Sequence, residues 1–181
     1  LLYPSYDTPL MECRFEALNN GRLPQILQDE FQDDFATLKS LYPGIERRDR
    51  QAEIDLCGHA LFTVKMRYYA ETSAQAGLSP FVYMFSWCPH SEKQTVGSFH
   101  SSELCIVHGT ETPLARFTKE DYALSDKMMS YWSQFAKTGN PNQQGQATWD
   151  AFEAENPRWL DIGKTGVEMV DSDIEDKYAI L

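Results

Sequence analysis

The sequence predicts an α/β fold in which helices pack against a small, largely buried sheet. Three amphipathic helical segments surround a short run, Phe81–Trp87, that is aromatic and apolar on both faces, as a buried strand of such a sheet would be. A hairpin pattern near the C-terminus supplies two further strands. Of the 181 residues 42% are hydrophobic and 13% aromatic, so the chain is able to bury a core and wholesale disorder is excluded.

The first predicted helix spans residues 22–41. Its apolar side chains recur at three- and four-residue steps while glutamines and aspartates fill the other face, which is the period of an amphipathic helix. The pair Pro43–Gly44 is expected to end it. Residues 1–20 are expected to form a loop or short helical pieces.

A second helix is predicted from about Arg50 to Ala76, followed by Gly77 where a glycine cap would stand. Gly58 costs about 1 kcal/mol relative to alanine in a helix interior. The segment is therefore either one helix or two helices with a join at this glycine. The expected buried stripe consists of Ile54, Cys57, Ala60, Leu61, Val64, Tyr68 and Tyr69.

The third predicted helix runs from about Lys119 to Lys137, with Thr118 as its N-cap and Asp121 three residues on. Gly139 permits a left-handed stop and Pro141 blocks continuation of the helix. The side chains expected to face inward are Tyr122, Leu124, Ser125, Met128, Met129, Trp132, Phe135 and Ala136.

The remaining elements are short. Residues 88–100 are expected to form a loop, and Ser101–Val107 a helical turn leading away from His100. Residues 159–162 and 167–170, with two glycines between them, predict the C-terminal hairpin.

Composition limits the partners of the chain. A net charge of −11 and a pI of about 4.7 argue against binding a nucleic acid or an anionic lipid surface. No run of about 20 apolar residues exists, so no membrane span is expected. The sequence begins at Leu1 without a basic leader pattern, which suggests an excerpt or a processed piece.

Four cysteines are too few for a disulfide scaffold, and their three possible pairings stay open: Cys13, Cys57, Cys88 and Cys105. Buried or half-buried thiols are the simplest interpretation. The compartment is undecided, with a secreted or periplasmic location slightly favoured over a cytoplasmic one.

No cofactor is predicted, because the chain has neither a phosphate-binding glycine motif nor a metal-ligand spacing among its four histidines. His59 is interpreted as a partly buried helix histidine, His90 as an exposed loop residue and His108 as a helix-terminal residue.

His100 differs in context, because it follows a buried strand by about thirteen residues, in the segment Gly97–Glu103. Catalytic histidines of doubly wound hydrolases occupy such loops at the carboxyl end of a strand. A neutral imidazole there is able to accept the proton of a serine hydroxyl and return it later. Glu103 is expected near the imidazole on a helical turn.

The chain does not supply a convincing nucleophile. A nucleophile elbow needs G-x-S-x-G on a strand-to-helix turn, and the motif does not occur in these residues. From its residues alone, the chain offers a general base and lacks the hydroxyl that this base would activate.

Two segments resemble the C-terminal part of type B carboxylesterases, the cholinesterase-like family. Gly97–Glu103 is similar to the family's G-x-x-H-x-x-[DE] segment around the catalytic histidine, and Trp132–Asn142 to its W-x-x-F-A-K-x-G-x-P-N helix end. Trp149 falls where a tryptophan commonly follows, and residues 77–85 look like the strand leading to the histidine loop. The resemblance covers about residues 45–162.

The resemblance implies an α/β-hydrolase fold, of which residues 1–181 would be the C-terminal part of a single domain. It assigns His100 as the catalytic base and Glu103 as a supporting neighbour that is not the triad acid. The serine, the acid and the oxyanion-hole glycines would belong to the N-terminal remainder of the same protein, in the same or a separate chain. The implied activity is hydrolysis of a small carboxylic ester, and this chain alone would be inactive.

Two alternatives remain at this point. Cholinesterase-like adhesion proteins resemble the same fold and bind through its surface, and an intact upstream serine would distinguish the enzyme from the binder. Alone, the chain would expose an apolar sheet edge and associate. Phe99 and Trp87 could line a pocket, although core packing is the simpler role for them.

Overall fold

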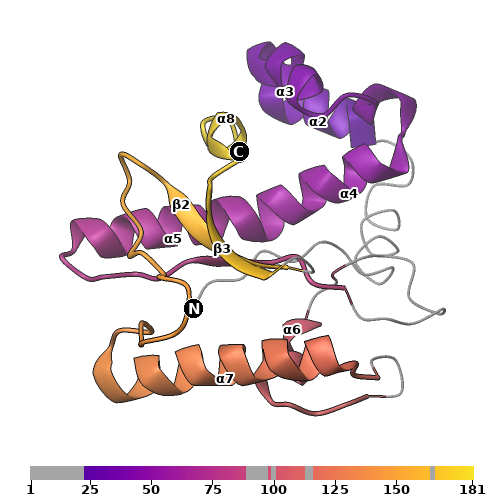
Figure 1. Ribbon diagram of the computed structural model, residues 1–181. Helices are drawn as coiled ribbons and strands as arrows, with labels where there is room; N and C mark the ends of the chain where they lie inside the picture. The colour runs from indigo at the N-terminus through magenta and orange to yellow at the C-terminus, as the bar shows by residue number, and fades with distance from the viewer. Residues whose placement is uncertain (1–22, 89–97, 99–100, 113–115, 164–165) are drawn as a thin grey trace.

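The computed structural model describes residues 23–88, 98, 101–112, 116–163 and 166–181 (Figure 1). Short helices occupy the N-terminal third, and a three-stranded sheet follows. The described elements are α2 (Leu23–Phe31), the 3-10 turn η1 (Gln32–Asp34), α3 (Phe35–Leu41), the 3-10 turn η2 (Ile45–Arg47), α4 (Arg50–Gly58), the π-helical turn η3 (His59–Thr63), α5 (Val64–Gln75), β1 (Tyr83–Phe85), α6 (Glu103–Val107), α7 (Lys119–Thr138), β2 (Arg158–Gly163), β3 (Gly166–Asp171) and α8 (Glu175–Tyr178).

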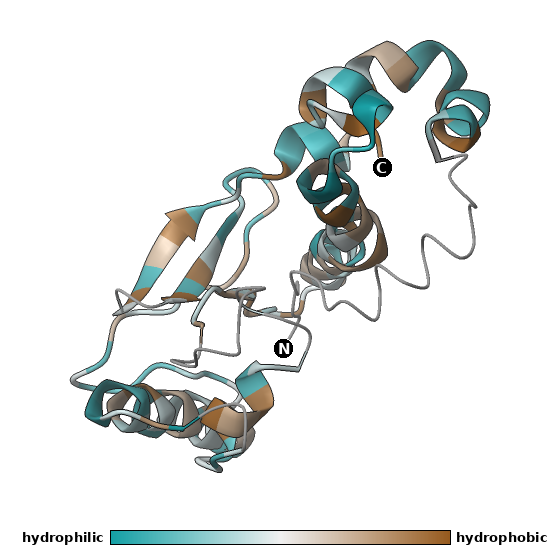
Figure 2. Ribbon diagram, turned by 90° about the vertical axis from the view of Figure 1, so that its right-hand side faces the viewer, coloured by the Kyte–Doolittle hydropathy of each residue, from teal (hydrophilic) through white to brown (hydrophobic). Residues whose placement is uncertain are grey.

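The sheet is mixed and has the order β1-β2-β3. Strand β1 runs parallel to β2, with Tyr83 opposite Leu160, and β2 runs antiparallel to β3, with Trp159 opposite Val170. Helix α7 covers one face of the sheet and α5 the other, as the two views of Figures 1 and 2 show. The predicted α/β layering is confirmed, and so is the hairpin.

Strand β1 alternates its side chains between two buried clusters. Phe81, Tyr83 and Phe85 pack toward α7, where Trp149 is 1% exposed and meets the first two rings edge-on. The Trp149 indole donates a hydrogen bond to the Val82 carbonyl at 2.9 Å. Val82 and Met84 pack toward α5 on the other face. Burial on both faces explains why this stretch reads as continuously apolar.

The strand is shorter than the apolar run that predicts it. Its ladder ends where the Ser86 and Trp87 amides both donate to the Ile162 carbonyl, at 3.0 and 3.1 Å. Two successive amides on one carbonyl break the extended register, so regular pairing with β2 stops at Phe85.

The first helix is not continuous, which corrects the expectation of one helix over 22–41. It is interrupted by η1, whose first residue, Gln32, has a φ of 44°. No residue of η1 is buried, so no packing holds this turn in α-helical geometry. The last helix of this stretch, α3, still ends at Leu41 as predicted. Gly44, in the predicted stop Pro43–Gly44, has a φ of 104°, which a glycine adopts readily.

The second helix contains the join predicted at Gly58. The chain stays helical there, but residues His59–Thr63 form a π-helical turn. Beyond the join, Val64 is buried as predicted, whereas Leu61, Tyr68 and Tyr69 are 40%, 62% and 63% exposed. Arg67 and Ala70 take buried places instead, so the predicted stripe was wrong at those three residues.

The caps of these helices agree with the sequence. Gly77 has a φ of 79°, and the Leu78 amide donates to the Ser73 carbonyl at 3.0 Å, which is the bond of a Schellman cap. Thr118 and Asp121 form the predicted capping box on α7. Gly139 ends that helix with a φ of 75°.

The inward face of α7 differs from the prediction at its edges. Leu124, Ser125 and Met128 are buried as expected, but Tyr122 is 49% exposed and Tyr131 takes a buried place instead. The Tyr131 hydroxyl reaches the Ala147 carbonyl at 2.6 Å, so the polar end of the ring is satisfied inside the core.

Helix α8 has no counterpart in the predicted elements. Ile174, at its start, is fully buried against α5 and β2. The Arg67 guanidinium lies between the rings of Phe152 and Tyr178, at 4.8 and 4.6 Å, and binds Glu175 in α8. Among the described residues, no helix combines the length and hydropathy needed to cross a membrane.

Candidate functional site

The candidate site lies between the carboxyl end of β1 and the start of α6. The predicted general base, His100, and its neighbour Phe99 lie outside the described residues, so their predicted roles stay predictions. The described residues nearest to them in sequence are Ser98, Ser101 and Ser102. The geometry of the site is therefore built from the residues on either side of His100.

Ser98 and Ser102 are joined to each other and to the sheet. The Ser98 hydroxyl donates to the Phe85 carbonyl at 2.8 Å, at the last residue of β1. Its oxygen lies 3.2 Å from the Ser102 hydroxyl oxygen. Both side chains are buried, 7% and 3% exposed. The two serines that flank His100 by two residues are thus fixed to the carboxyl end of the strand.

Ser101 has a left-handed backbone, with a φ of 68°. This conformation costs a residue with a Cβ roughly 1 kcal/mol and persists where the surroundings impose it. The Leu104 amide donates to the Ser101 carbonyl at 3.2 Å, which forms the turn into α6. The predicted helical turn after His100 is confirmed as α6, beginning at Glu103.

Glu103 is the first residue of α6 and is half-buried, with its Oε2 atom shielded from solvent. Its place in the first turn favours a carboxylate, because the amide end of a helix carries partial positive charge. Its predicted proximity to the imidazole is untested, since His100 lies outside the described residues.

Cys105 is the one described nucleophilic thiol on α6, and its surroundings keep it protonated. Burial raises the pKa of the Cys105 thiol, backbone hydrogen bonds oppose this, and the charges of Glu103 and Asp121 raise it further. The thiol donates to the Ser102 carbonyl at 3.0 Å. A protonated, donating thiol is a poor nucleophile.

Trp87 packs in the core, which was the simpler of its two predicted roles. It is 2% exposed, and its indole donates to Asp121 Oδ1 at 2.8 Å. Asp121 also caps α7, so this bond ties the exit of β1 to the beginning of that helix. A second link joins α6 to α7, where the Ser125 hydroxyl donates to the Ile106 carbonyl at 2.6 Å.

The other described histidines occupy different places. His59 is buried in the π-helical turn, with its Nδ1 2.9 Å from the Tyr42 hydroxyl. Burial lowers the pKa of His59, and Lys177 lowers it further against the opposing charges of Asp55 and Asp173. His108 is exposed at the end of α6, as predicted, and His90 lies outside the described residues.

Ser86 is the serine closest to the end of β1. Its hydroxyl donates to Asp161 Oδ1 at 2.7 Å, across to β2. Burial raises the pKa of Asp161, whereas the Ser86 bond lowers it and the charge of Glu168 raises it. The described residues that follow Ser86, Trp87 and Cys88, are not helical, so Ser86 does not sit directly before a helix as a nucleophile elbow requires.

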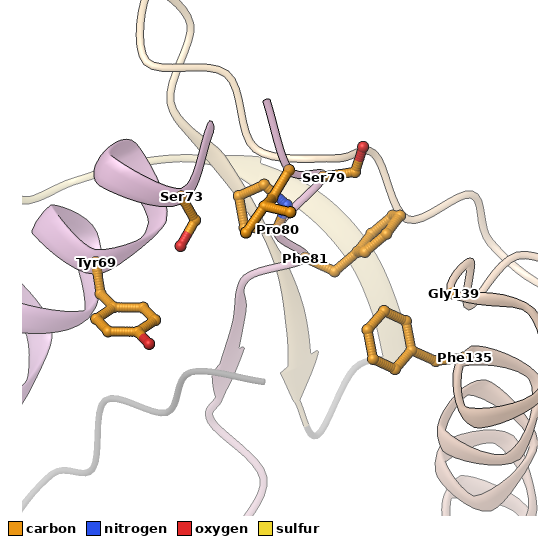
Figure 3. A pocket seen from close by; sticks show the side chains of 8 residues that line it. Tyr69, Ser73, Ser79, Pro80, Phe81, Phe135 and Gly139 are labelled. Carbon is orange, nitrogen blue, oxygen red and sulfur yellow. The ribbon is translucent and has the colours of Figure 1, made fainter. Parts of the chain in front are cut away.

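A pocket of about 360 Å³ lies at the opposite end of β1 (Figure 3). Phe81 and Phe135 line one side of it, with their rings edge-on at 5.9 Å, and Tyr69 of α5 lies across from them. Its lining comes from three separate segments, which is why no sequence pattern indicated it. It is separated from Ser98 and Ser102 by the length of the strand.

No group of three or more acidic, cysteine or histidine side chains among the described residues is placed to hold a metal ion. The described part of the site consists of hydroxyl groups, backbone carbonyls, the Cys105 thiol and the Glu103 carboxylate. These groups hold Ser98 and Ser102 at the end of β1, and the predicted base, His100, lies outside the described residues.

Comparison with known proteins finds that residues 17–180 match the model of the carboxylesterase family. Carboxylesterase 1C of Mus musculus is 29% identical over 164 residues, which are 83% of this chain and 29% of that protein. Carboxylesterase 5A of Felis catus is 32% identical over 138 residues, 70% of this chain and 25% of that protein. The fatty acyl-CoA hydrolase precursor, medium chain, of Anas platyrhynchos is 30% identical over 120 residues, which are 64% of this chain and 21% of that protein. The chain thus spans less than a third of the length of each of these relatives.

Proposed function

Since the chain belongs to the carboxylesterase family, we propose that it is the histidine-bearing part of a serine-dependent carboxylic ester hydrolase. Its α/β-hydrolase fold is partial: two helical layers enclose a small mixed sheet. The base is His100, and Glu103 supports the hydrogen bonds around it. The nucleophilic serine and the triad acid belong to an N-terminal remainder of the same protein, which is the partner this chain requires.

The observation that carries the proposal is the family match together with the segment Gly97–Glu103, which holds a histidine at the spacing of the family's catalytic one. The described residues on either side support this. Ser98 is bonded to the last carbonyl of β1, and sites of α/β sheets form at the carboxyl ends of strands.

The chemistry assigned to His100 has two steps. Its neutral imidazole accepts the proton of the serine hydroxyl as that oxygen attacks the ester carbonyl, and the resulting imidazolium gives the proton to the departing alcohol. Backbone N–H groups of the remainder stabilise the oxyanion. A water molecule then transfers its proton to the imidazole, attacks the acyl-enzyme and releases the carboxylic acid, with the proton returned to the serine.

The test compares His100→Ala with the wild type in the complete protein, using p-nitrophenyl acetate as the ester. Removing the base of a triad lowers kcat by about a thousandfold or more. His108→Ala is the matched control, because His108 is exposed and only eight residues away. Its turnover should equal that of the wild type.

Full turnover by the His100→Ala protein would reject the proposal. A well-folded wild type without any esterase activity, and with the upstream serine replaced, would instead favour the alternative of a non-catalytic, cholinesterase-like binding protein.

A further inference from the structure

The two serines that flank His100 in sequence form a directed hydrogen-bond relay. A hydroxyl has one proton to donate, and that of Ser98 goes to the Phe85 carbonyl. The proton in the bond between the two serines must therefore come from Ser102. The relay runs from Ser102 to Ser98 and ends on the backbone of β1.

We propose that Ser98 and Ser102, which are bonded to each other and to the carboxyl end of β1, are positioning residues for His100. This inference rests on the proposed function, because it gives the relay a purpose only if His100 is the base. Each serine stands two residues from His100, and their hydroxyl oxygens are 3.2 Å apart. The relay thus ties together the two described positions that lie two residues before and two residues after His100.

Three features favour positioning over ordinary loop packing. Ser98 and Ser102 are both buried although neither belongs to a helix or strand. Their hydroxyl groups therefore cannot exchange these hydrogen bonds for bonds to water. Ser101, between His100 and Ser102 in sequence, is held at a φ of 68°. The Ser102 carbonyl also accepts a bond from the Cys105 thiol at 3.0 Å. The backbone at Ser101 and Ser102 is therefore held at several points.

The relay has a hierarchy that the experiment can use. Ser98 contacts the strand directly, whereas Ser102 acts through Ser98. Loss of the Ser98 hydroxyl releases both positions from the strand, and loss of the Ser102 hydroxyl releases one. The double variant should therefore lose no more activity than Ser98→Ala alone, because nothing remains for Ser102 to hold.

The test measures kcat and KM of Ser98→Ala, Ser102→Ala and the double variant in the complete protein with p-nitrophenyl acetate. Misplacing a catalytic group by about 1 Å costs on the order of a hundredfold, so we expect kcat to fall about 10- to 100-fold for Ser98→Ala and about 3- to 10-fold for Ser102→Ala. KM should change by less than about twofold, since the inference gives neither serine a contact with the ester.

Ser125→Ala is the matched control. Ser125 is also buried and also donates to a backbone carbonyl, that of Ile106, but it lies on α7. Its loss should lower the unfolding temperature about as much as that of Ser98 and leave kcat unchanged.

Equal kcat for Ser98→Ala, Ser125→Ala and the wild type, with His100→Ala inactive, would overturn the inference while the proposed function stands. An active His100→Ala protein would overturn both. If Ser98→Ala does not fold, Ser102→Ala decides: a loss of kcat at constant KM supports the relay, and an unchanged kcat refutes it.

Discussion

Replacing Arg67 by methionine tests how the C-terminal helix is held to the molecule. Arg67 is 5% exposed, and its guanidinium binds Glu175 through two nitrogen atoms at 3.1 to 3.2 Å and Glu71 at 3.0 Å. Its guanidinium carbon also lies over the Phe152 and Tyr178 rings, 4.8 and 4.6 Å from their centroids. One cation therefore joins α5, α8 and the loop before β2.

The expected loss of stability follows from these contacts. Breaking a fully buried ion pair costs about 3 to 5 kcal/mol, but the Glu71 and Glu175 side chains keep 26% and 36% of their exposure, which reduces the penalty to about 2 kcal/mol. The two ring contacts add about 0.5 to 1 kcal/mol each. Because methionine restores part of the packing, we expect Arg67→Met to cost about 3 kcal/mol, or about 6 to 12 °C in melting temperature.

Thermal and urea unfolding of Arg67→Met measure this loss. Arg116→Met is the control. Arg116 forms an ion pair with Glu111 at 2.9 Å, but its side chain is 77% exposed. A surface pair of this kind contributes about 0 to 1 kcal/mol. If both variants lose less than 1 kcal/mol, the view of Arg67 as the anchor of α8 is wrong.

Two further predictions concern His59 and Ser101. Burial lowers the pKa of His59 in the folded protein, so the contribution of this histidine to stability is complete above about pH 6.5 and is lost as the pH falls below that value. His59→Gln should therefore reduce the drop in unfolding free energy between pH 7.5 and 5.5, and an unchanged drop would refute this prediction. Ser101→Gly relieves a left-handed residue and should change the unfolding free energy by about +0.5 to +1 kcal/mol; a less stable variant in chemical unfolding would show that no strain is stored there.

The sequence predicts those elements whose pattern is local. The Thr118 capping box and the glycine stops at Gly77 and Gly139 depend on residues within a few positions, and each occurs as predicted. The layering of the sheet also follows from local pattern, because a strand apolar on both faces has to be covered twice. These features need no knowledge of distant contacts.

The errors come from the helical phase and from distant contacts. The stripe extended from Ile54 is right at Cys57 and Val64 but reaches Tyr68 and Tyr69, which are exposed, because the buried face passes through Arg67 and Ala70 instead. Arg67 then faces inward, a position that a charged residue takes only with partners, and its partner Glu175 lies 108 residues away. Nothing in either local sequence signals that pairing, which is why α8 was missed.

The candidate site shows the same division. Chemistry and family pattern led to the prediction of His100 and Glu103, which stays untested, whereas the hydrogen bonds of Ser98 and Ser102 escaped notice, because serines in a loop of small polar residues carry no distinguishing signal. The relay becomes visible only once the end of β1 is placed beside them.

The two ends of β1 differ in the chemistry they can support. At its start, Phe81 lies in an apolar pocket with Tyr69 and Phe135, which offers ring surfaces and few fixed dipoles. At its end, Phe85 presents a carbonyl to a buried hydroxyl relay. A general base needs its position fixed by directional bonds, and directional bonds need buried hydrogen-bonding groups. The Phe85 end meets that requirement with hydroxyl side chains, and it is the end from which the chain leads to His100.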